Sequence, residues 1–158
     1  MTIRRGKQQD LPQVYDLIKE LALYERAPQE VTNTLEDMVH DGFGDRPIFS
    51  FFVAEEGDQI RGLALYYTAY STWKGRTLYL EDLIVTEPYR RSGIGKKLFD
   101  AVAREAFQTK ARRMAWQVLE WNEPAIAFYK KINASLDAEW INCRLTGEEI
   151  RRYASSLA

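Results

Sequence analysis

The sequence predicts one mixed α/β domain over residues 1–158, and three of its features support that fold class. Apolar residues recur at helical spacing near the N-terminus and again after residue 93, which predicts two amphipathic helices. Between them lie apolar and aromatic runs separated by short turn sequences, a pattern typical of antiparallel hairpins. Another strand-like run follows the second helix, so we expect it to pair in parallel with the strand before that helix.

The N-terminal half is expected to contain a short strand, two helices and three antiparallel strands. Asp10 can cap a helix whose apolar stripe runs to about residue 25. Thr34 with Asp37 predicts the start of a short second helix that ends at Gly42. The expected strands are residues 2–5, 48–55, 60–70 and 77–86.

Residues 78–107 have the order strand, turn, glycine-rich corner and helix. Pro88 ends the strand, and Gly93 and Gly95 precede the helical pattern, so free amides and the positive end of a helix dipole meet at this corner. Such a corner binds anions, most often phosphate. A Walker-type loop is excluded because Lys97 stands where a hydroxyl is required, and a dinucleotide loop because Leu98 replaces the third glycine. A helix start whose glycines only permit a tight turn is the open alternative.

The C-terminal third is expected to alternate strands and helices. Residues 114–119 form a predicted strand, and Asn122 can cap a helix that runs to about residue 131. Residues 138–145 form a predicted last strand, and Thr146 with Glu149 forms a capping box for a final helix.

Composition excludes several functional classes. The chain is 46% hydrophobic and 28% charged, with a net charge of -1, which is typical of a globular protein and argues against nucleic-acid binding. No apolar run approaches membrane-spanning length, and the first residues lack the apolar core of a signal peptide. The single cysteine, Cys143, fits a reducing compartment, so we expect a cytoplasmic protein. His40 has no neighbouring set of metal ligands, so no metal is expected.

Two motifs in the second half resemble those of a known family. The pattern Arg90-x-x-Gly93-x-Gly95, after the strand sequence EDLIV, resembles the acetyl-CoA pyrophosphate motif of the GNAT superfamily of N-acetyltransferases. The sequence WNEPAIAFYK resembles a second motif of that superfamily, in which Asn122 and Tyr129 are seven residues apart. Together with IKELALYE, DGFG, LALYY and LYLEDLIV, these stretches are most similar to the spermidine/spermine acetyltransferases and their thialysine-acetylating relatives.

The resemblance implies the GNAT fold and an acetyl-CoA-dependent N-acetyltransferase. That fold has a central, mixed but mostly antiparallel twisted sheet with flanking helices, and a splayed parallel strand pair that holds the coenzyme. The acetyl group would pass directly to the primary amine of a small cationic molecule, such as a polyamine, a diamine or a lysine analogue like thialysine. The open alternatives are a protein N-terminal or lysine acetyltransferase and a non-catalytic acyl-CoA-binding sensor. A homodimer is also implied, with no nucleic-acid or membrane partner.

The resemblance assigns two catalytic residues. Tyr129 would be the proton donor to the departing thiolate, although an isolated tyrosine on such a helix is usually a core residue. Glu81 would accept the proton of the amine through water. Strand alternation places Glu81 and Asp82 on opposite faces unless a bulge intervenes, so which carboxylate is the main base stays open. For Asp82 a structural ion pair is an equal alternative.

The implied coenzyme contacts come from three stretches of the chain. The strand amides of Leu83, Ile84 and Val85 would bind the oxyanion, and the amides of residues 91–96 would bind the pyrophosphate. Asn122, Pro124 and Ala125 would contact the pantetheine arm. The expected coenzyme-binding residues are Leu83, Ile84, Val85, Arg90, Arg91, Ser92, Gly93, Ile94, Gly95, Lys96, Asn122, Pro124 and Ala125.

The amine pocket is expected to combine carboxylates with aromatic walls, which suits a cation. The substrate-binding residues implied by the resemblance are Tyr24, Glu25, Trp73, Glu81 and Asp82.

The sequence departs from the family pattern at two positions. Ser71 stands where the polyamine enzymes have an acidic residue, which favours a single-amine substrate over a long polyamine. Asn133 stands where glycine usually follows the helix, and asparagine tolerates the left-handed conformation that this turn requires.

Overall fold

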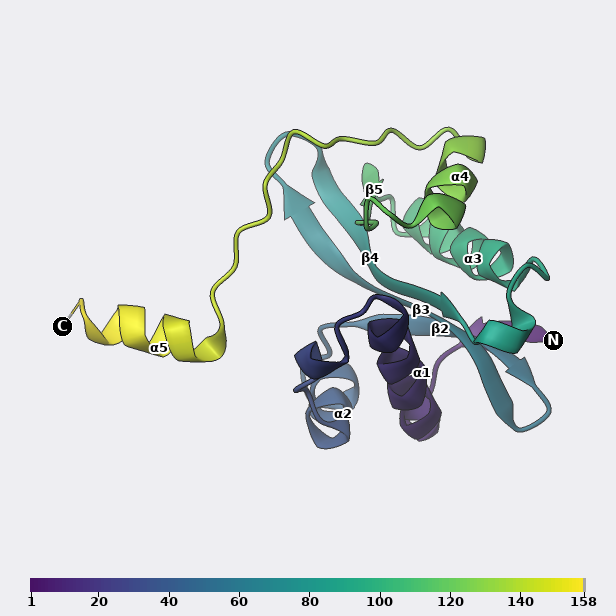
Figure 1. The fold of residues 1–158 in the computed structure, drawn as a ribbon, viewed down its shortest axis with the longest axis horizontal. Helices are drawn as coiled ribbons and strands as arrows, with labels where there is room; N and C mark the ends of the chain where they lie inside the picture. The colour runs from purple at the N-terminus through teal and green to yellow at the C-terminus, as the bar shows by residue number, and fades with distance from the viewer. Residues whose placement is uncertain (158) are drawn as a thin grey trace. The chain divides into compact units, whose positions relative to one another are not determined.

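The computed structural model describes residues 1–157, and the chain divides into two compact units, with the boundary in the sequence between residues 119 and 120 (Figure 1). The first unit holds a five-stranded sheet with three α-helices and three short 3-10 helices. Its elements are β1 (Thr2–Arg5), η1 (Gln8–Asp10), α1 (Leu11–Tyr24), η2 (Pro28–Glu30), α2 (Leu35–Phe43), β2 (Ser50–Glu56), β3 (Gln59–Ser71), β4 (Gly75–Val85), η3 (Glu87–Tyr89), α3 (Ile94–Gln108) and β5 (Arg113–Ala115).

The sheet has the strand order β1-β2-β3-β4-β5. Three of its four pairings are antiparallel, and β4 pairs in parallel with β5. The parallel contact is short, because it joins only residues 77–79 of β4 to residues 113–115 of β5. The mixed, mostly antiparallel sheet confirms the predicted fold class. Beyond Tyr79, β4 has no strand partner on that edge among the described residues.

Helices cover both faces of the sheet: α1 and α2 lie on one face and α3 on the other (Figure 1). The α1 face holds a buried cluster whose members come from both helices and the central strands: Leu11, Val14, Leu17, Met38, Phe51, Val53, Ile60, Leu63, Leu65 and Ile84. On the other face α3 lies so close to β3 that a Cβ on Gly62 would meet Leu98 Cδ1 at 2.9 Å. Glycine at this position therefore allows the close packing of helix on sheet.

A β-bulge interrupts the pairing of β3 with β4. Asp82 is opposite Leu65 and Leu80 is opposite Tyr66, so Glu81 is the extra residue with no partner on β3. The simple alternation that separates Glu81 from Asp82 therefore does not apply. Because Leu65 belongs to the core on the α1 face, Asp82 also lies on that face.

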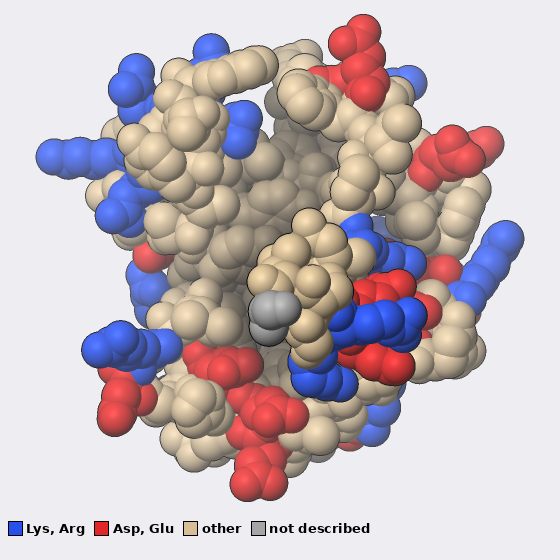
Figure 2. Space-filling view, turned by 90° about the vertical axis from the view of Figure 1, so that its left-hand side faces the viewer, with Lys and Arg blue, Asp and Glu red and all other residues tan. Residues whose placement is uncertain are grey.

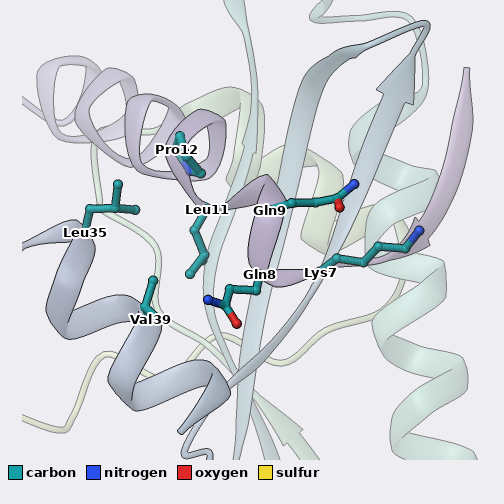
Figure 3. A pocket seen from close by; sticks show the side chains of 7 residues that line it. All are labelled: Lys7, Gln8, Gln9, Leu11, Pro12, Leu35 and Val39. Atoms are coloured by element: carbon teal, nitrogen blue, oxygen red, sulfur yellow. The ribbon is translucent and has the colours of Figure 1, made fainter.

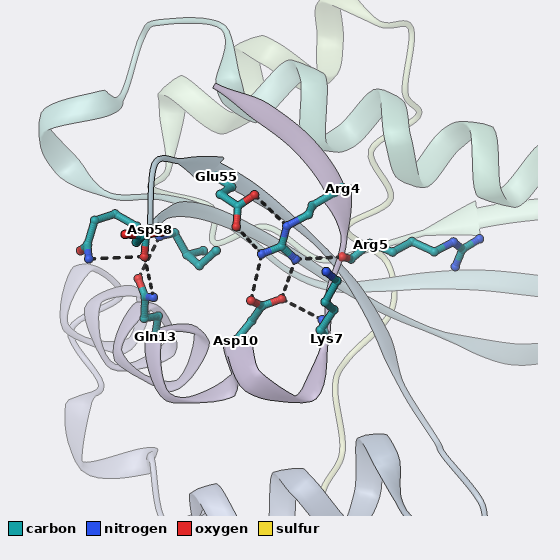
Figure 4. A network of polar contacts seen from close by, with 9 residues as sticks. Arg4, Arg5, Lys7, Asp10, Gln13, Glu55 and Asp58 are labelled. Carbon is teal, nitrogen blue, oxygen red and sulfur yellow. Dashed lines mark hydrogen bonds and ion pairs between the residues drawn. The ribbon is translucent and has the colours of Figure 1, made fainter.

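One predicted helix cap is wrong. Asp10 precedes α1, but its side chain accepts no hydrogen bond from that helix. Its carboxylate instead binds the guanidinium of Arg4 at 2.7 and 2.9 Å and the backbone amide of Lys7 at 2.8 Å (Figure 4). Arg4 also pairs with Glu55 on β2, so this partly buried network ties η1 to the sheet. The ion pair of Asp10 with Arg4 therefore takes the place of the predicted helix cap.

The other caps agree with the sequence. The Thr34 hydroxyl accepts from the Asp37 amide at 3.0 Å and begins α2, which ends at Phe43, one residue later than expected. In the second unit, α4 (Glu123–Lys131) begins at Asn122 and α5 (Gly147–Ser155) begins with the capping box of Thr146 and Glu149.

The second unit also corrects a predicted strand. Residues 138–145, although apolar and β-branched in part, have no strand conformation in the structure. Strand propensity alone does not form a ladder, because backbone hydrogen bonds need a partner strand. The strand expected at 114–119 is shorter, since β5 ends at Ala115. Asn133 has φ 59°, and the Ala134 amide donates to Tyr129 O at 3.0 Å, so the left-handed turn after α4 is confirmed.

Charged side chains of both signs lie next to one another on the face shown in Figure 2. Of the helices formed by residues 1–157, none combines the length and apolar character required to cross a bilayer.

Candidate active site

The glycine corner presents a row of backbone amides. Arg91 has φ 62° and Gly93 has φ 82°, so two left-handed residues turn the chain before α3 begins at Ile94. The first helical hydrogen bond runs from Lys97 N to Gly93 O at 3.1 Å. Among the described backbone bonds, none starts from an amide of residues 91–96. These donors are therefore available to an external acceptor.

The space beside the two glycines of the corner is open. A Cβ built on Gly93 would meet no atom within 4 Å, and one on Gly95 would meet only Val85 Cγ2 at 3.8 Å. The approach to the amides is therefore open, and the left-handed φ of Gly93 is one that L side chains rarely adopt. The Ser92 hydroxyl donates to Tyr89 O and stabilises the preceding turn. Lys96 places a positive charge here but also pairs with Asp100 at 2.7 Å.

The free edge of β4 leads toward this corner. The Thr86 amide donates to Arg61 O on β3 at 2.9 Å. Because backbone groups alternate along a strand, the Ile84 amide also faces β3, whereas those of Leu83 and Val85 face the opposite edge. Those two amides lie beyond the short pairing with β5. They form a second set of available donors.

Three predicted substrate residues converge at the C-terminal end of α1. Glu25 follows α1, and Glu81 and Asp82 come from the bulge of β4. Burial, together with the negative charges of Glu81 and Glu25, raises the pKa of Asp82 to about 7. Burial likewise raises the pKa of Glu25 above its ordinary value. None of the ion pairs found in residues 1–157 neutralises these carboxylates, so the structure gives Asp82 no structural salt bridge.

Two tyrosines beside this cluster escaped the sequence reasoning. Tyr67 and Tyr79 are cross-strand partners whose rings stack at 5.2 Å, and the Tyr67 hydroxyl lies close enough to Glu81 to sense its charge. Burial and then the charge of Glu81 raise the pKa of Tyr67 to about 12, so its phenol stays neutral. The adjacent tyrosines of LALYY point to opposite faces of a strand, so the sequence could have indicated a tyrosine on this face. The bulge that brings Glu81 to it could not be read from the sequence.

Arg90 points toward α1. Its Nε donates to Val85 O at 2.9 Å, its Nη2 donates to Glu20 Oε1 at 3.2 Å, and its guanidinium lies 4.8 Å from the centre of the Tyr24 ring. The Tyr24 side chain therefore stacks with the arginine that precedes the glycine corner. This contact joins a predicted substrate residue to a predicted coenzyme residue.

Trp73 does not join the cluster within one chain. It lies in the turn between β3 and β4 and is 80% exposed. That turn follows Ser71, whereas Asp82 of the carboxylate cluster lies opposite Leu65. At about 3.3 Å per residue, roughly 20 Å of strand separates the two places.

The remaining predicted residues lie together on one helix of the second unit. The Asn122 side chain accepts from the Ala125 amide at 3.4 Å, and Pro124 occupies the first turn of α4. Tyr129 is 7% exposed, and burial raises its pKa to about 12. Burial of Tyr129 thus favours the neutral, protonated form of its phenol.

The first unit also has a hollow that none of the predicted site residues lines. An open hollow of about 530 Å³ lies between η1, α1 and α2 (Figure 3), lined by Lys7, Gln8, Gln9, Leu11, Pro12, Leu35 and Val39. In residues 1–157 no three His, Cys, Asp or Glu side chains are grouped so that they could hold a metal ion.

Comparison with known proteins adds independent information. Residues 11–134 match the model of the Acetyltransferase (GNAT) family. Thialysine N-epsilon-acetyltransferase of Bos taurus is 39% identical, and the alignment covers 96% of each chain. Spermidine/spermine N(1)-acetyltransferase-like protein 1 of Homo sapiens is 35% identical over 94% of this chain and 23% of that protein. A solved structure of an integron cassette protein from the mobile metagenome of V. cholerae has a TM-score of 0.78 and 25% identity, covering 97% of this chain and 96% of that one.

Proposed function

The chain belongs to the GNAT family of acetyltransferases and is an N-acetyltransferase, and on this premise we propose that it acetylates the primary amine of a small cationic molecule. Acetyl-CoA supplies the acetyl group as a thioester. The observation that carries the choice of substrate class is the convergence of Glu25, Glu81 and Asp82 at the end of α1. Three carboxylates without a neutralising partner favour an ammonium ion, and the adjacent tyrosines add cation–π attraction.

Glu81 is the proposed proton acceptor. An alkylammonium has an ordinary pKa of about 10.4 and cannot attack until it loses a proton. Glu81 lies at the exposed side of the bulge, where its carboxylate can take that proton through water. Tyr67 lies beside Glu81 as a neutral phenol and would orient the carboxylate by donating to it. Asp82 keeps the amine beside it as a second negative group.

The backbone of β4 and of the corner is proposed to bind the coenzyme. The amides of Leu83 and Val85 would donate to the carbonyl oxygen as it gains negative charge. Ile84 lies between them and orients both amides by pairing with β3. The amides of residues 91–96 would bind the diphosphate, with charge supplied by Arg91 and Lys96.

The second unit is proposed to supply the acid and the contacts to the pantetheine arm. Tyr129 would donate from its Oη to the departing sulfur, and its raised pKa keeps the hydroxyl protonated until that moment. Asn122, Pro124 and Ala125 would contact the arm. This role requires both units to work as one catalytic domain, residues 1–158.

We further propose a homodimer, because Trp73 lies too far along its own strand to reach the carboxylates of the same chain. A second copy would bring Trp73 to the amine site. The single cysteine and the small-molecule substrate fit a cytoplasmic location.

The test is a thiol-release assay with acetyl-CoA and a panel of spermidine, putrescine, lysine and thialysine. We expect turnover of at least one amine, with single-amine acceptors preferred because Ser71 removes one acidic contact. Lysine-containing peptides are the control, and faster turnover of a peptide would indicate a protein acetyltransferase. Coenzyme binding without turnover of any acceptor would indicate a sensor domain and would refute the proposal.

A further inference from the structure

The carboxylate of Glu20 on α1 is bound by three donors from the segment that follows β4. Thr86 Oγ1 donates to Oε2 at 2.8 Å, the Glu87 amide donates to Oε1 at 2.9 Å, and Arg90 Nη2 donates to Oε1 at 3.2 Å. Both carboxylate oxygens are therefore engaged. The contacts span 66 to 70 residues of sequence, so they are tertiary contacts that the local sequence does not produce.

These donors frame the turn between the free edge of β4 and the glycine corner. Thr86 follows the last residue of β4, the Glu87 amide begins η3, and Arg90 immediately precedes the left-handed Arg91. Arg90 also donates to Val85 O at 2.9 Å, so the same guanidinium binds the end of the strand and the helix. The position of the corner relative to β4 thus depends on the pair of Glu20 and Arg90.

The pair also reaches the amine side of the site. Tyr24 lies one helical turn after Glu20, and the Arg90 guanidinium lies 4.8 Å from the centre of its ring. Glu25, a member of the carboxylate cluster, is the next residue. Because Arg90 has these three partners, its guanidinium is directed toward α1 and away from the amides of the corner.

We propose that Glu20 is a positioning residue that, through Arg90, aligns the coenzyme-binding corner with β4 and with the amine-binding end of α1. The inference rests on the proposed placement of the coenzyme diphosphate at residues 91–96. Glu20 contacts neither coenzyme nor amine in this role. Arg90 contributes by its bond to Glu20, not as a direct ligand of the phosphates.

The experiment compares Glu20→Gln, Arg90→Met and the double variant in the full chain. Coenzyme A affinity is measured by titration calorimetry, and the KM for acetyl-CoA and kcat by thiol release. Loss of a charged hydrogen-bond network should weaken coenzyme affinity roughly tenfold in each single variant. Because both act through one contact, the double variant should be no weaker than the single ones. At saturating substrates kcat should stay within about twofold, since no proton-transfer group is changed.

The matched control is Asp16→Asn, which removes an ion pair with Lys19 on the same helix at 2.7 Å without touching the turn. It should leave coenzyme affinity unchanged. A purely structural role of Glu20 would lower the melting temperature of Glu20→Gln and leave its coenzyme affinity equal to that of the control, and this result would overturn the proposal. If Arg90 were a direct phosphate ligand, Glu20→Gln would free its guanidinium. Coenzyme A affinity would then stay the same or improve in Glu20→Gln and would fall in Arg90→Met. This result too would overturn the proposal.

If the coenzyme diphosphate does not bind at residues 91–96, a different result is expected. Titration of Gly93→Val with coenzyme A tests that placement independently of Glu20. If this variant binds coenzyme A as well as the wild type does, the corner is not the diphosphate site. If it loses binding while Glu20→Gln does not, the placement stands and only the positioning role is refuted.

Discussion

The glycine corner and the carboxylate cluster bind opposite charges in two different ways. The corner offers backbone amides from one continuous stretch, residues 91–96, and its side chains contribute little to its shape. The cluster is made of side chains, Glu25 from the end of α1 and Glu81 with Asp82 from a bulge in β4. A backbone site depends on the conformation and placement of one stretch of chain, so it should be sensitive to the loss of a glycine or of the contacts that position the stretch. A side-chain site depends on tertiary contacts, so it can be dissected one residue at a time.

The largest expected effect is on the chemistry of the cluster. Glu81→Gln keeps the size of the side chain but removes the proton acceptor, so kcat should fall by about 100-fold or more in the thiol-release assay. Coenzyme A affinity should not change, because the corner uses other groups. Glu36→Gln, at an exposed glutamate of α2, is the control and should retain full activity. A kcat within threefold of the wild type would transfer the role of base to Asp82.

A substitution in the glycine corner should change the affinity for coenzyme A instead of the catalytic rate. Gly93→Val places a β-branched residue at φ 82°, which costs about 1–2 kcal/mol or forces the turn to move. Calorimetry should then show coenzyme A binding weaker by about tenfold.

Gly57→Val is the matched control for this prediction. Gly57 has φ 57° and, like Gly93, nothing within 4 Å of a built Cβ, but it lies in the turn between β2 and β3. Both variants should lose similar stability, and only Gly93→Val should lose affinity. Equal affinities for the two would separate the corner from coenzyme binding.

The smallest effect is the pH dependence of stability at Asp82. Its pKa rises from 3.8 to about 7 on folding, so between these values the folded protein holds a proton that the unfolded chain has released. Stability from this group is therefore present at low pH and is lost as the pH rises through about 7. Asp82→Asn cannot ionise, so its melting temperature should exceed that of the wild type by a few degrees at about pH 8.5 and by less at about pH 5.

Asp82→Asn should be more stable than the wild type but should bind the amine less well. Removal of the second carboxylate should raise the KM for the amine several-fold at about pH 8.5, where the wild-type group is ionised. Melting curves and amine kinetics at the two pH values check both effects. A melting difference that does not depend on pH would show that Asp82 is not held near neutrality.

The motifs could be predicted because their residues are close in the sequence. The order of strand, corner and helix follows from Pro88, Gly93 and the apolar spacing after it, and the structure confirms it. The caps at Thr34, Asn122 and Thr146 are also local, and they form as expected. Asp10 is the exception, because Arg4 offers its carboxylate a stronger partner than the helix amides.

The parts that could not be predicted all depend on residues distant in the sequence. The bulge at Glu81 arises from the register of β3 with β4, and it places both carboxylates where their charges interact. Tyr67 becomes a partner of Glu81 only through that register. The direction of Arg90 is set by Glu20 and Tyr24 on α1.

The family, the glycine corner with its unpaired amides, and the residue types needed for acetyl transfer to an amine could be recognised in the sequence. These features are local, because backbone conformation at glycine, proline and caps is set within a few residues. The sequence did not reveal which carboxylates lie near one another, that Tyr67 lies beside Glu81, or where the guanidinium of Arg90 points. Those features follow from strand register and helix packing, in which the partners lie 14 to 70 residues apart and no local preference specifies them.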